Sequence, residues 1–158
     1  AFEPQQLVLV GRAGALPLRR EPRDEAAHAA RLRFAVQVFG EMQKRGGGSI
    51  VNQSSTAAWL YSGFYGLAKA AINGLTQQLA HELGGMNIRV NAIAPGPTDT
   101  EATRKQAGDA AKELVKGLAI KRMGQPDDLV GACLYLLSDD AAWVTGQVLA
   151  VDGGQVFR

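Results

Sequence analysis

Short apolar runs alternate along the chain with longer stretches in which apolar residues recur every three or four positions. The short runs have the length of buried strands and lie at residues 7–10, 49–53, 88–94 and 147–151. The longer stretches predict helices at residues 24–45, 64–83 and from Pro126 onward, with a partly helical segment at 101–121. Strands that alternate with helices are typical of a parallel sheet covered on both faces. The pattern therefore predicts an α/β fold with a doubly wound parallel sheet of about four strands.

Glycines mark the ends of these elements. Gly46, Gly47 and Gly48 follow the first predicted helix, and Gly84 and Gly85 follow the second. Glycine is common just after a helix because it adopts the left-handed conformation without strain. We therefore expect Gly84 and Gly85 to stop the long helix.

Composition and charge narrow the classes of protein to which the chain can belong. Hydrophobic residues make up 46% and charged residues 20%, which is the balance of a globular domain and excludes a membrane-spanning or disordered chain. The net charge of +2 argues against nucleic acid as a partner. Cys133 is the single cysteine, which excludes an internal disulfide and fits a cytoplasmic location. His28 and His81 have no cluster of cysteines or carboxylates around them, so we expect no metal site.

Polar side chains follow the predicted strands. Ser54 and Ser55 come after the second strand, and ligands of open parallel sheets bind beyond the carboxyl ends of the strands. Tyr65 and Lys69 lie four positions apart at the start of the long helix, on one face. A nearby ammonium favours the phenolate form of a tyrosine, so the pair could transfer a proton to or from an alcohol or ketone oxygen. A solvated lysine beside a half-buried tyrosine is the alternative interpretation.

A stripe of small residues runs along the same predicted helix. Gly66, Ala70 and Gly74 repeat at four-residue spacing. Glycine inside a helix costs roughly 1 kcal/mol relative to alanine, so we expect close packing on the stripe to compensate. The packing partner is either another helix, for example from a second subunit, or the protein's own sheet.

Five signatures run in order through residues 46–154. They are Gly48-Ser49-Ile50-Val51-Asn52-Gln53-Ser54-Ser55, Tyr65-Gly66-Leu67-Ala68-Lys69, Asn91-Ala92-Ile93-Ala94-Pro95-Gly96-Pro97-Thr98-Asp99-Thr100, Arg122-Met123-Gly124-Gln125-Pro126-Asp127-Asp128, and Thr145-Gly146 with Val151-Asp152-Gly153-Gly154. Together they resemble the C-terminal part of the short-chain dehydrogenase/reductases, and the bacterial 3-oxoacyl-carrier-protein reductases and their relatives look most similar. The resemblance implies a Rossmann-like sheet in a single partial domain, residues 1–158. Within it, residues 1–45 form a divergent N-terminal segment and residues 46–154 the catalytic C-terminal part.

The resemblance also implies an activity. The chain would be an oxidoreductase that transfers a hydride between NAD or NADP and a small-molecule carbonyl compound or secondary alcohol. Tyr65 would donate or accept the proton, and Lys69 would favour the phenolate and hydrogen-bond the nicotinamide ribose. Ser55 would orient the substrate oxygen, with Ser54 as the alternative.

Further residues would contact the cofactor or the substrate. Besides Tyr65 and Lys69, the nicotinamide half of the cofactor would contact Pro95, Gly96, Thr98 and Thr100. Residues 101–121 would form a mobile substrate loop. The family and the stripe of small residues together favour a homo-oligomer, with no membrane partner.

Departures from the family pattern leave other interpretations open. Ser55 precedes Tyr65 by ten positions, slightly fewer than in the family, and Gly11-Arg12-Ala13-Gly14 stands where the family has Asn-Asn-Ala-Gly. No asparagine precedes Asn52, so the family's catalytic asparagine is missing. The glycine-rich turn for the pyrophosphate is also missing, so we expect an N-terminally truncated chain.

Two alternatives to an enzyme follow from these departures. The first is a catalytically silent remnant that acts as an interaction or structural subunit. The second is an unrelated α/β binding module.

Overall fold

The computed structural model describes residues 39–101, 103, 104 and 110–157. Residues 39–44 are helical and are followed by the first described strand. The elements that follow, with η for a 3-10 helix, are β1 (Gly48–Gln53), η1 (Thr56–Trp59), α2 (Gly63–Leu83), η2 (Gly84–Met86), β2 (Ile88–Pro95), α4 (Ala110–Gly117), α5 (Pro126–Leu137), η3 (Asp139–Ala141) and β3 (Val148–Val151).

The described strands form a parallel sheet in the order β1-β2-β3. The register pairs Gln53 with Ile93 and Pro95 with Val151, so the carboxyl ends of the strands meet at one edge. The predicted α/β fold with a parallel sheet is therefore confirmed, and three of the four expected strands are seen. The expected strand at residues 7–10 and the start of the helix at 24–45 lie outside the described residues.

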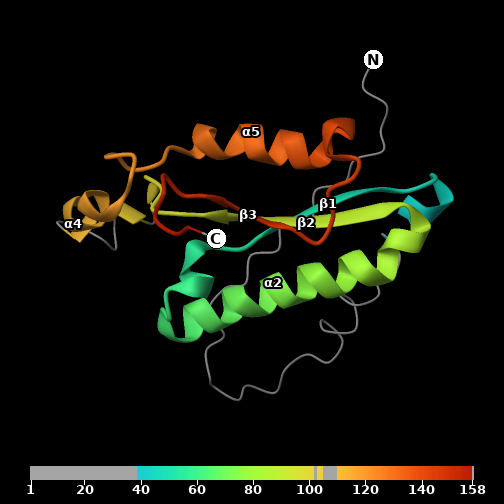
Figure 1. The fold of residues 1–158 in the computed structure, drawn as a ribbon, viewed down its shortest axis with the longest axis horizontal. Coiled ribbons are helices and arrows are strands. Elements are labelled where there is room, and N and C mark those ends of the chain that lie inside the picture. Colours follow the sequence, from blue (N-terminus) through green and yellow to red (C-terminus); the bar gives the residue numbers. More distant parts are fainter. Residues whose placement is uncertain (1–38, 102, 105–109, 158) are drawn as a thin grey trace.

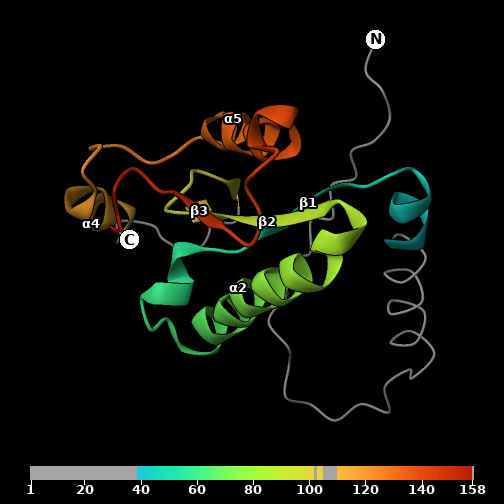
Figure 2. The same cartoon turned by 45° about the vertical axis from the view of Figure 1, so that its right-hand side comes forward.

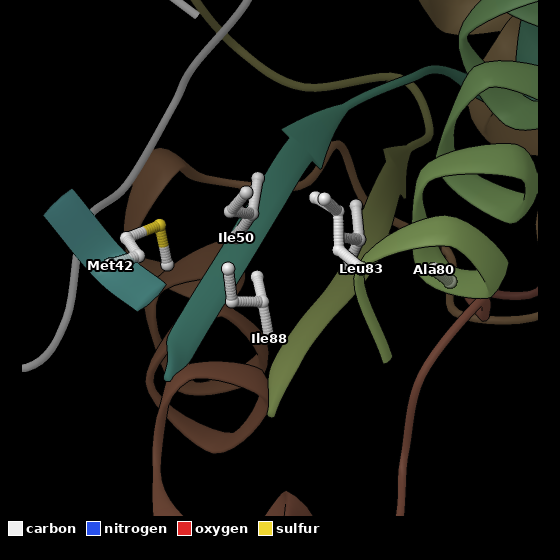
Figure 3. Close-up of a cluster of buried hydrophobic side chains, with 6 residues drawn as sticks. Met42, Ile50, Ala80, Leu83 and Ile88 are labelled. Atoms are coloured by element: carbon white, nitrogen blue, oxygen red, sulfur yellow. The ribbon is translucent and has the colours of Figure 1, made fainter. Parts of the chain in front are cut away.

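Helices cover both faces of the sheet (Figures 1 and 2). In Figure 1, α5 lies above the sheet and α2 below it. Adjacent residues of a strand point to opposite faces, and the core follows this rule: Ile50 belongs to a cluster with α2, whereas Val51 belongs to a cluster with α5. Figure 3 shows the first cluster, in which Met42 of the 39–44 helix and Leu83 of α2 lie against the strands.

The second cluster lies between the sheet and α5. Leu136 and Leu137 are buried there against Val51 and Ile93. Cys133 packs against this cluster, and burial raises the pKa of its thiol.

The long helix α2 ends at Leu83 with Gly84 as its C-cap, as expected, but Gly84 does not adopt the left-handed conformation. Gly84 has a right-handed helical backbone, with φ −57° and ψ −39°, and η2 continues the chain for another turn. The residue that adopts the left-handed conformation is Asn87, at φ 57°, and its Nδ2 donates a hydrogen bond to Gly46 O at 2.8 Å. Asparagine tolerates this conformation better than most residues, so Asn87 turns the chain into β2.

Within the part of the chain that the structure describes, no helix is both long enough and apolar enough to cross a membrane.

Candidate active site

The two serines after β1 differ in what they contact. Ser54 is 1% exposed, and its Oγ lies 2.5 Å from Asn73 Oδ1 and 3.3 Å from Lys69 O, so its hydroxyl joins β1 to α2. Ser55 is partly exposed and is the N-cap of η1, where its Oγ accepts a hydrogen bond from Ala57 N at 3.2 Å. Ser55 is therefore the more exposed of the two serines, whereas Ser54 is buried between β1 and α2.

Lys69 is a buried cation beside a half-exposed tyrosine. Its side chain is 4% exposed, and Nζ donates a hydrogen bond to Gln53 O at 3.0 Å, at the end of β1. Nζ also lies 5.7 Å from the centre of the Tyr65 ring, within the range of a cation–π contact. Burial lowers the pKa of Lys69, because desolvation disfavours its charged form. The ammonium has two further hydrogens besides the one that it donates to Gln53 O.

The first turn of α2 lies close to η1, with Gly66 against Ala57. A Cβ added to Gly66 would lie 2.6 Å from Ala57 O, so only glycine permits this approach. The stripe of small residues is thus divided: Gly66 packs on the protein's own η1, while Gly74 has no atom within 4 Å of an added Cβ. For Gly66 the close packing partner is therefore a helix of the same chain, the 3-10 helix η1.

The loop after β2 is held by the turn after β3. Gly96 N donates to Val151 O at 3.1 Å, and a Cβ at Gly96 would lie 2.6 Å from the Cα of Asp152. Pro95 O is 3.5 Å from Ser55 Oγ and 3.3 Å from Thr56 Oγ1. The carbonyl end of β2 therefore adjoins the serine loop after β1.

The two threonines of this loop use their hydroxyls within the loop. Thr98 Oγ1 donates to Gly96 O at 3.0 Å, and Thr98 pairs with Gly124 in an isolated bridge. Thr100 Oγ1 accepts from Thr103 N at 3.2 Å. Residues 102 and 105–109 of the expected substrate loop lie outside the described part of the chain, whose next element is α4.

An ion pair fixes the start of α5, next to this loop. Both guanidinium nitrogens of Arg122 donate to the carboxylate of Asp128, at 2.6 and 2.9 Å. Asp128 Oδ2 also accepts from Gln125 N, which closes a capping box. The Arg122 hydrogen bonds, with the Gln125 amide, lower the pKa of Asp128 to about 2.

Residues near the C-terminus also reach the site, and the sequence pattern did not single them out for it. Thr56 is 3% exposed, and its Oγ1 donates to Gln155 Oε1 at 2.7 Å. The two residues are 99 positions apart, and neither lies in a recognisable catalytic pattern. The only sequence signal that could have found them is their position: Thr56 directly follows Ser55, and Gln155 directly follows Gly153-Gly154.

The arrangement can bind an oxygen and move a proton to it. Ser55 supplies a hydroxyl, Tyr65 a phenol and Lys69 an ammonium, all at the edge where the described strands end. Phenol and ammonium together are the groups expected of a general acid or base that acts on an alcohol or ketone oxygen.

Comparison with known proteins identifies relatives of this chain. A family model described as enoyl-(acyl carrier protein) reductase matches residues 29–155. An uncharacterised oxidoreductase of Mycobacterium tuberculosis is 66% identical over 122 residues, which are 77% of this chain and 49% of that protein.

Two solved structures are similar and contain nicotinamide cofactors. A 3-oxoacyl-(acyl-carrier protein) reductase of Brucella melitensis with bound NAD is 40% identical, with a TM-score of 0.64 over 70% of this chain and 42% of that one. A putative 2-deoxy-D-gluconate 3-dehydrogenase of Agrobacterium tumefaciens with bound NADP is 36% identical, with a TM-score of 0.71 over 80% of this chain and 55% of that one. The chain thus spans about half the length of the relatives that it matches.

Proposed function

The chain belongs to the short-chain dehydrogenase/reductase family, and on this premise we propose that it takes part in hydride transfer between NAD or NADP and a carbonyl compound or secondary alcohol. The observation that carries the proposal is that the Lys69 ammonium is buried beside the Tyr65 ring. The same ammonium binds Gln53 O at the end of β1, two residues before Ser55. NAD(P)H, when bound, supplies the hydride. A 3-oxoacyl thioester is the substrate class that we favour, because one similar structure is a 3-oxoacyl reductase.

Each of the three residues has a distinct role in this proposal. Tyr65 gives its phenolic proton to the carbonyl oxygen as that oxygen gains charge, or takes a proton in the reverse direction. Lys69 stabilises the phenolate that results and keeps Nζ hydrogens for ribose hydroxyls. Ser55 donates a hydrogen bond to the same substrate oxygen and so orients it.

The described residues suit the nicotinamide half of the cofactor. Lys69 Nζ spends one hydrogen on Gln53 O, which leaves donors for ribose oxygens. Pro95, Gly96, Thr98 and Thr100 form the loop that we propose as the second wall of this half-site. The adenosine half would need residues other than those that the structure describes.

Substitution of Tyr65 tests the proposed proton transfer. Tyr65→Phe removes the phenolic proton, so NAD(P)H-dependent carbonyl reduction should fall by about 100-fold or more while cofactor binding persists. Tyr135→Phe, on α5, is the matched control and should leave turnover unchanged. Unchanged turnover in Tyr65→Phe would refute the role of Tyr65.

Cofactor binding separates an enzyme from a catalytically silent subunit. Trp59 and Trp143 provide intrinsic fluorescence, and titration with NADH or NADPH should quench it saturably if the nicotinamide half binds. A flat titration with both cofactors, together with no turnover, would favour the silent interaction subunit.

We also propose that the protein is a homo-oligomer that associates through the outer face of α2. Phe64, Leu67 and Leu75 are 79%, 64% and 52% exposed there, and a Cβ added at Gly74 would meet no atom within 4 Å. Gly74→Leu should therefore reduce the size of the particle in light scattering. Gly131→Leu, at an equally open helical glycine of α5, should not. An unchanged size for Gly74→Leu would remove this proposal.

A further inference from the structure

The segment after β3, residues 152–157, contacts each of the loops that form the candidate active site. It touches the loop after β2 at Gly96, as described above, and the chain beyond α4 through two backbone hydrogen bonds. In the latter, Ile120 N donates to Gly153 O at 2.8 Å and Ala119 N donates to Gly154 O at 3.3 Å. Figures 1 and 2 both show this end of the chain at the same end of the molecule as η1 and α4.

The shape of this segment is fixed from within. The carboxylate of Asp152 accepts hydrogen bonds from Gly154 N and Val156 N, both at 2.9 Å. Gly153 and Gly154 have φ values of +65° and +76°, which side chains other than glycine rarely adopt. A turn with this internal bonding presents Gln155 in a defined direction.

Gln155 makes the shortest side-chain contact between this segment and the serine loop. The Thr56 hydroxyl has a single hydrogen, which it donates to Gln155 Oε1 at 2.7 Å, while Pro95 O lies farther away at 3.3 Å. The contacts of the Ser55 hydroxyl itself are longer, at 3.2 Å to Ala57 N and 3.5 Å to Pro95 O. Hydroxyl hydrogen bonds are strongest at about 2.7–2.8 Å, so the bond from Thr56 to Gln155 is the stronger of the two that hydroxyls of this loop donate, the other being that of Ser55 to Pro95 O.

We propose that Gln155 is a positioning residue that fixes Ser55 through Thr56. Thr56 is buried and directly follows Ser55 at the start of η1, so its hydrogen bond to Gln155 sets where the serine hydroxyl stands. The consequence for turnover rests on the proposed function, since it assumes that Ser55 orients the substrate oxygen. The mechanical link between Gln155 and η1 does not rest on it.

The link between Gln155 and η1 can be tested without an activity assay. The measurement is acrylamide quenching of the fluorescence of Trp59, the last residue of η1. The chain has two tryptophans, so Trp143→Phe leaves Trp59 as the single fluorescent reporter. Trp143 is 99% exposed, so its replacement should not disturb the fold. In that background, Gln155→Ala should raise acrylamide quenching of Trp59 by about twofold, because η1 opens locally when its tie is lost. Gln155→Glu keeps an acceptor for Thr56 and should match the parent.

Controls separate this link from general loosening. Gln147→Ala removes an exposed glutamine at the opposite end of β3 and should leave the quenching unchanged. Thr56→Val should raise quenching as Gln155→Ala does, and the two together should add nothing further. Quenching of Trp59 that is unaffected by both Gln155→Ala and Thr56→Val would overturn the proposal.

Kinetics then test the positioning role. If the chain shows Tyr65-dependent turnover, Gln155→Ala should lower kcat about 10-fold with little change in cofactor affinity, and Gln155→Glu should restore it. Turnover that depends on Tyr65 and is untouched by Gln155→Ala would refute the role of Gln155. A chain without turnover in any variant refutes the proposed function alone, and the quenching result still decides the link between Gln155 and η1.

Discussion

At the scale of single residues, the buried Lys69 is the unusual group of this protein. A lysine at 4% exposure is expensive to keep charged, and the Gln53 carbonyl and the Tyr65 ring are the groups that compensate. The sequence predicted the Tyr65–Lys69 pair from their spacing alone. It did not predict that the lysine is buried, because burial depends on η1 and β1 closing over the start of α2.

Because the pKa of Lys69 is lowered in the folded protein, the free energy of unfolding should vary with pH in the alkaline range. The unfolded chain binds a proton at Lys69 more tightly than the folded chain, so the free energy of unfolding should rise with pH between the lowered pKa and about 10.5. Lys69→Met should lack this rise, whereas Lys121→Met, at an exposed lysine, should keep it. Urea unfolding from pH 7 to 10.5 measures the difference. A parallel pH dependence in parent and Lys69→Met would contradict the prediction.

At the scale of elements, the end of α2 shows how a helix stop is decided. Gly84 has a right-handed helical backbone, and Gly85 does not have a positive φ either. Asn87 is the residue that adopts the left-handed conformation. The predicted end of the helix at Gly84 is therefore correct in position, but the left-handed residue lies at Asn87, since the position of β2 determines where the chain must turn. The start of α5 was predicted correctly, because Pro126 and the acidic residues after it act through local capping.

Two substitutions at this junction should have opposite signs. Gly84→Ala meets nothing within 4 Å and sits in a helical conformation, so it should raise the free energy of unfolding by about 0.5–1 kcal/mol. Asn87→Ala strains a left-handed position and loses the bond to Gly46 O, so it should lower the free energy by about 1–2 kcal/mol. Asn87→Gly should lose less. Chemical denaturation of the three variants checks the order, and a neutral Asn87→Ala would show that the junction is not strained.

At the scale of the whole molecule, loops from distant parts of the chain are joined at one end of the sheet. Strands β2 and β3 pair in parallel, so the loops that follow them meet as close neighbours. Gly96 and Asp152 pack so closely that no side chain fits between them. This contact links the proposed cofactor loop to the segment that carries Gln155.

Gly96→Ala should therefore disturb both stability and site. An added Cβ would lie 2.6 Å from Asp152 Cα, and overpacking of this kind costs about 1–3 kcal/mol. Gly131→Ala, an open position on α5, is the control and should be neutral or stabilising. Thermal or urea unfolding reports the difference. If Gly96→Ala matched the stability of the parent protein, the close contact with Asp152 would not be rigid.

The sequence by itself determined the elements of this protein and the candidate groups for its chemistry. Apolar periodicity placed β1, α2, β2 and β3 within one or two residues, because each pattern reflects which face of its own element is buried. Local spacing also singled out Tyr65 and Lys69 as candidate catalytic groups, and the family resemblance added Ser55.

Only the tertiary structure decided how these groups are held. It distinguished the buried Ser54 from the partly exposed Ser55, made Asn87 the turning point after α2, and joined Thr56 to Gln155 across 99 positions. Such contacts arise from parallel strand pairing, which brings together strand ends that are remote in the chain. No local pattern of hydrophobic and polar residues encodes which of those ends will meet.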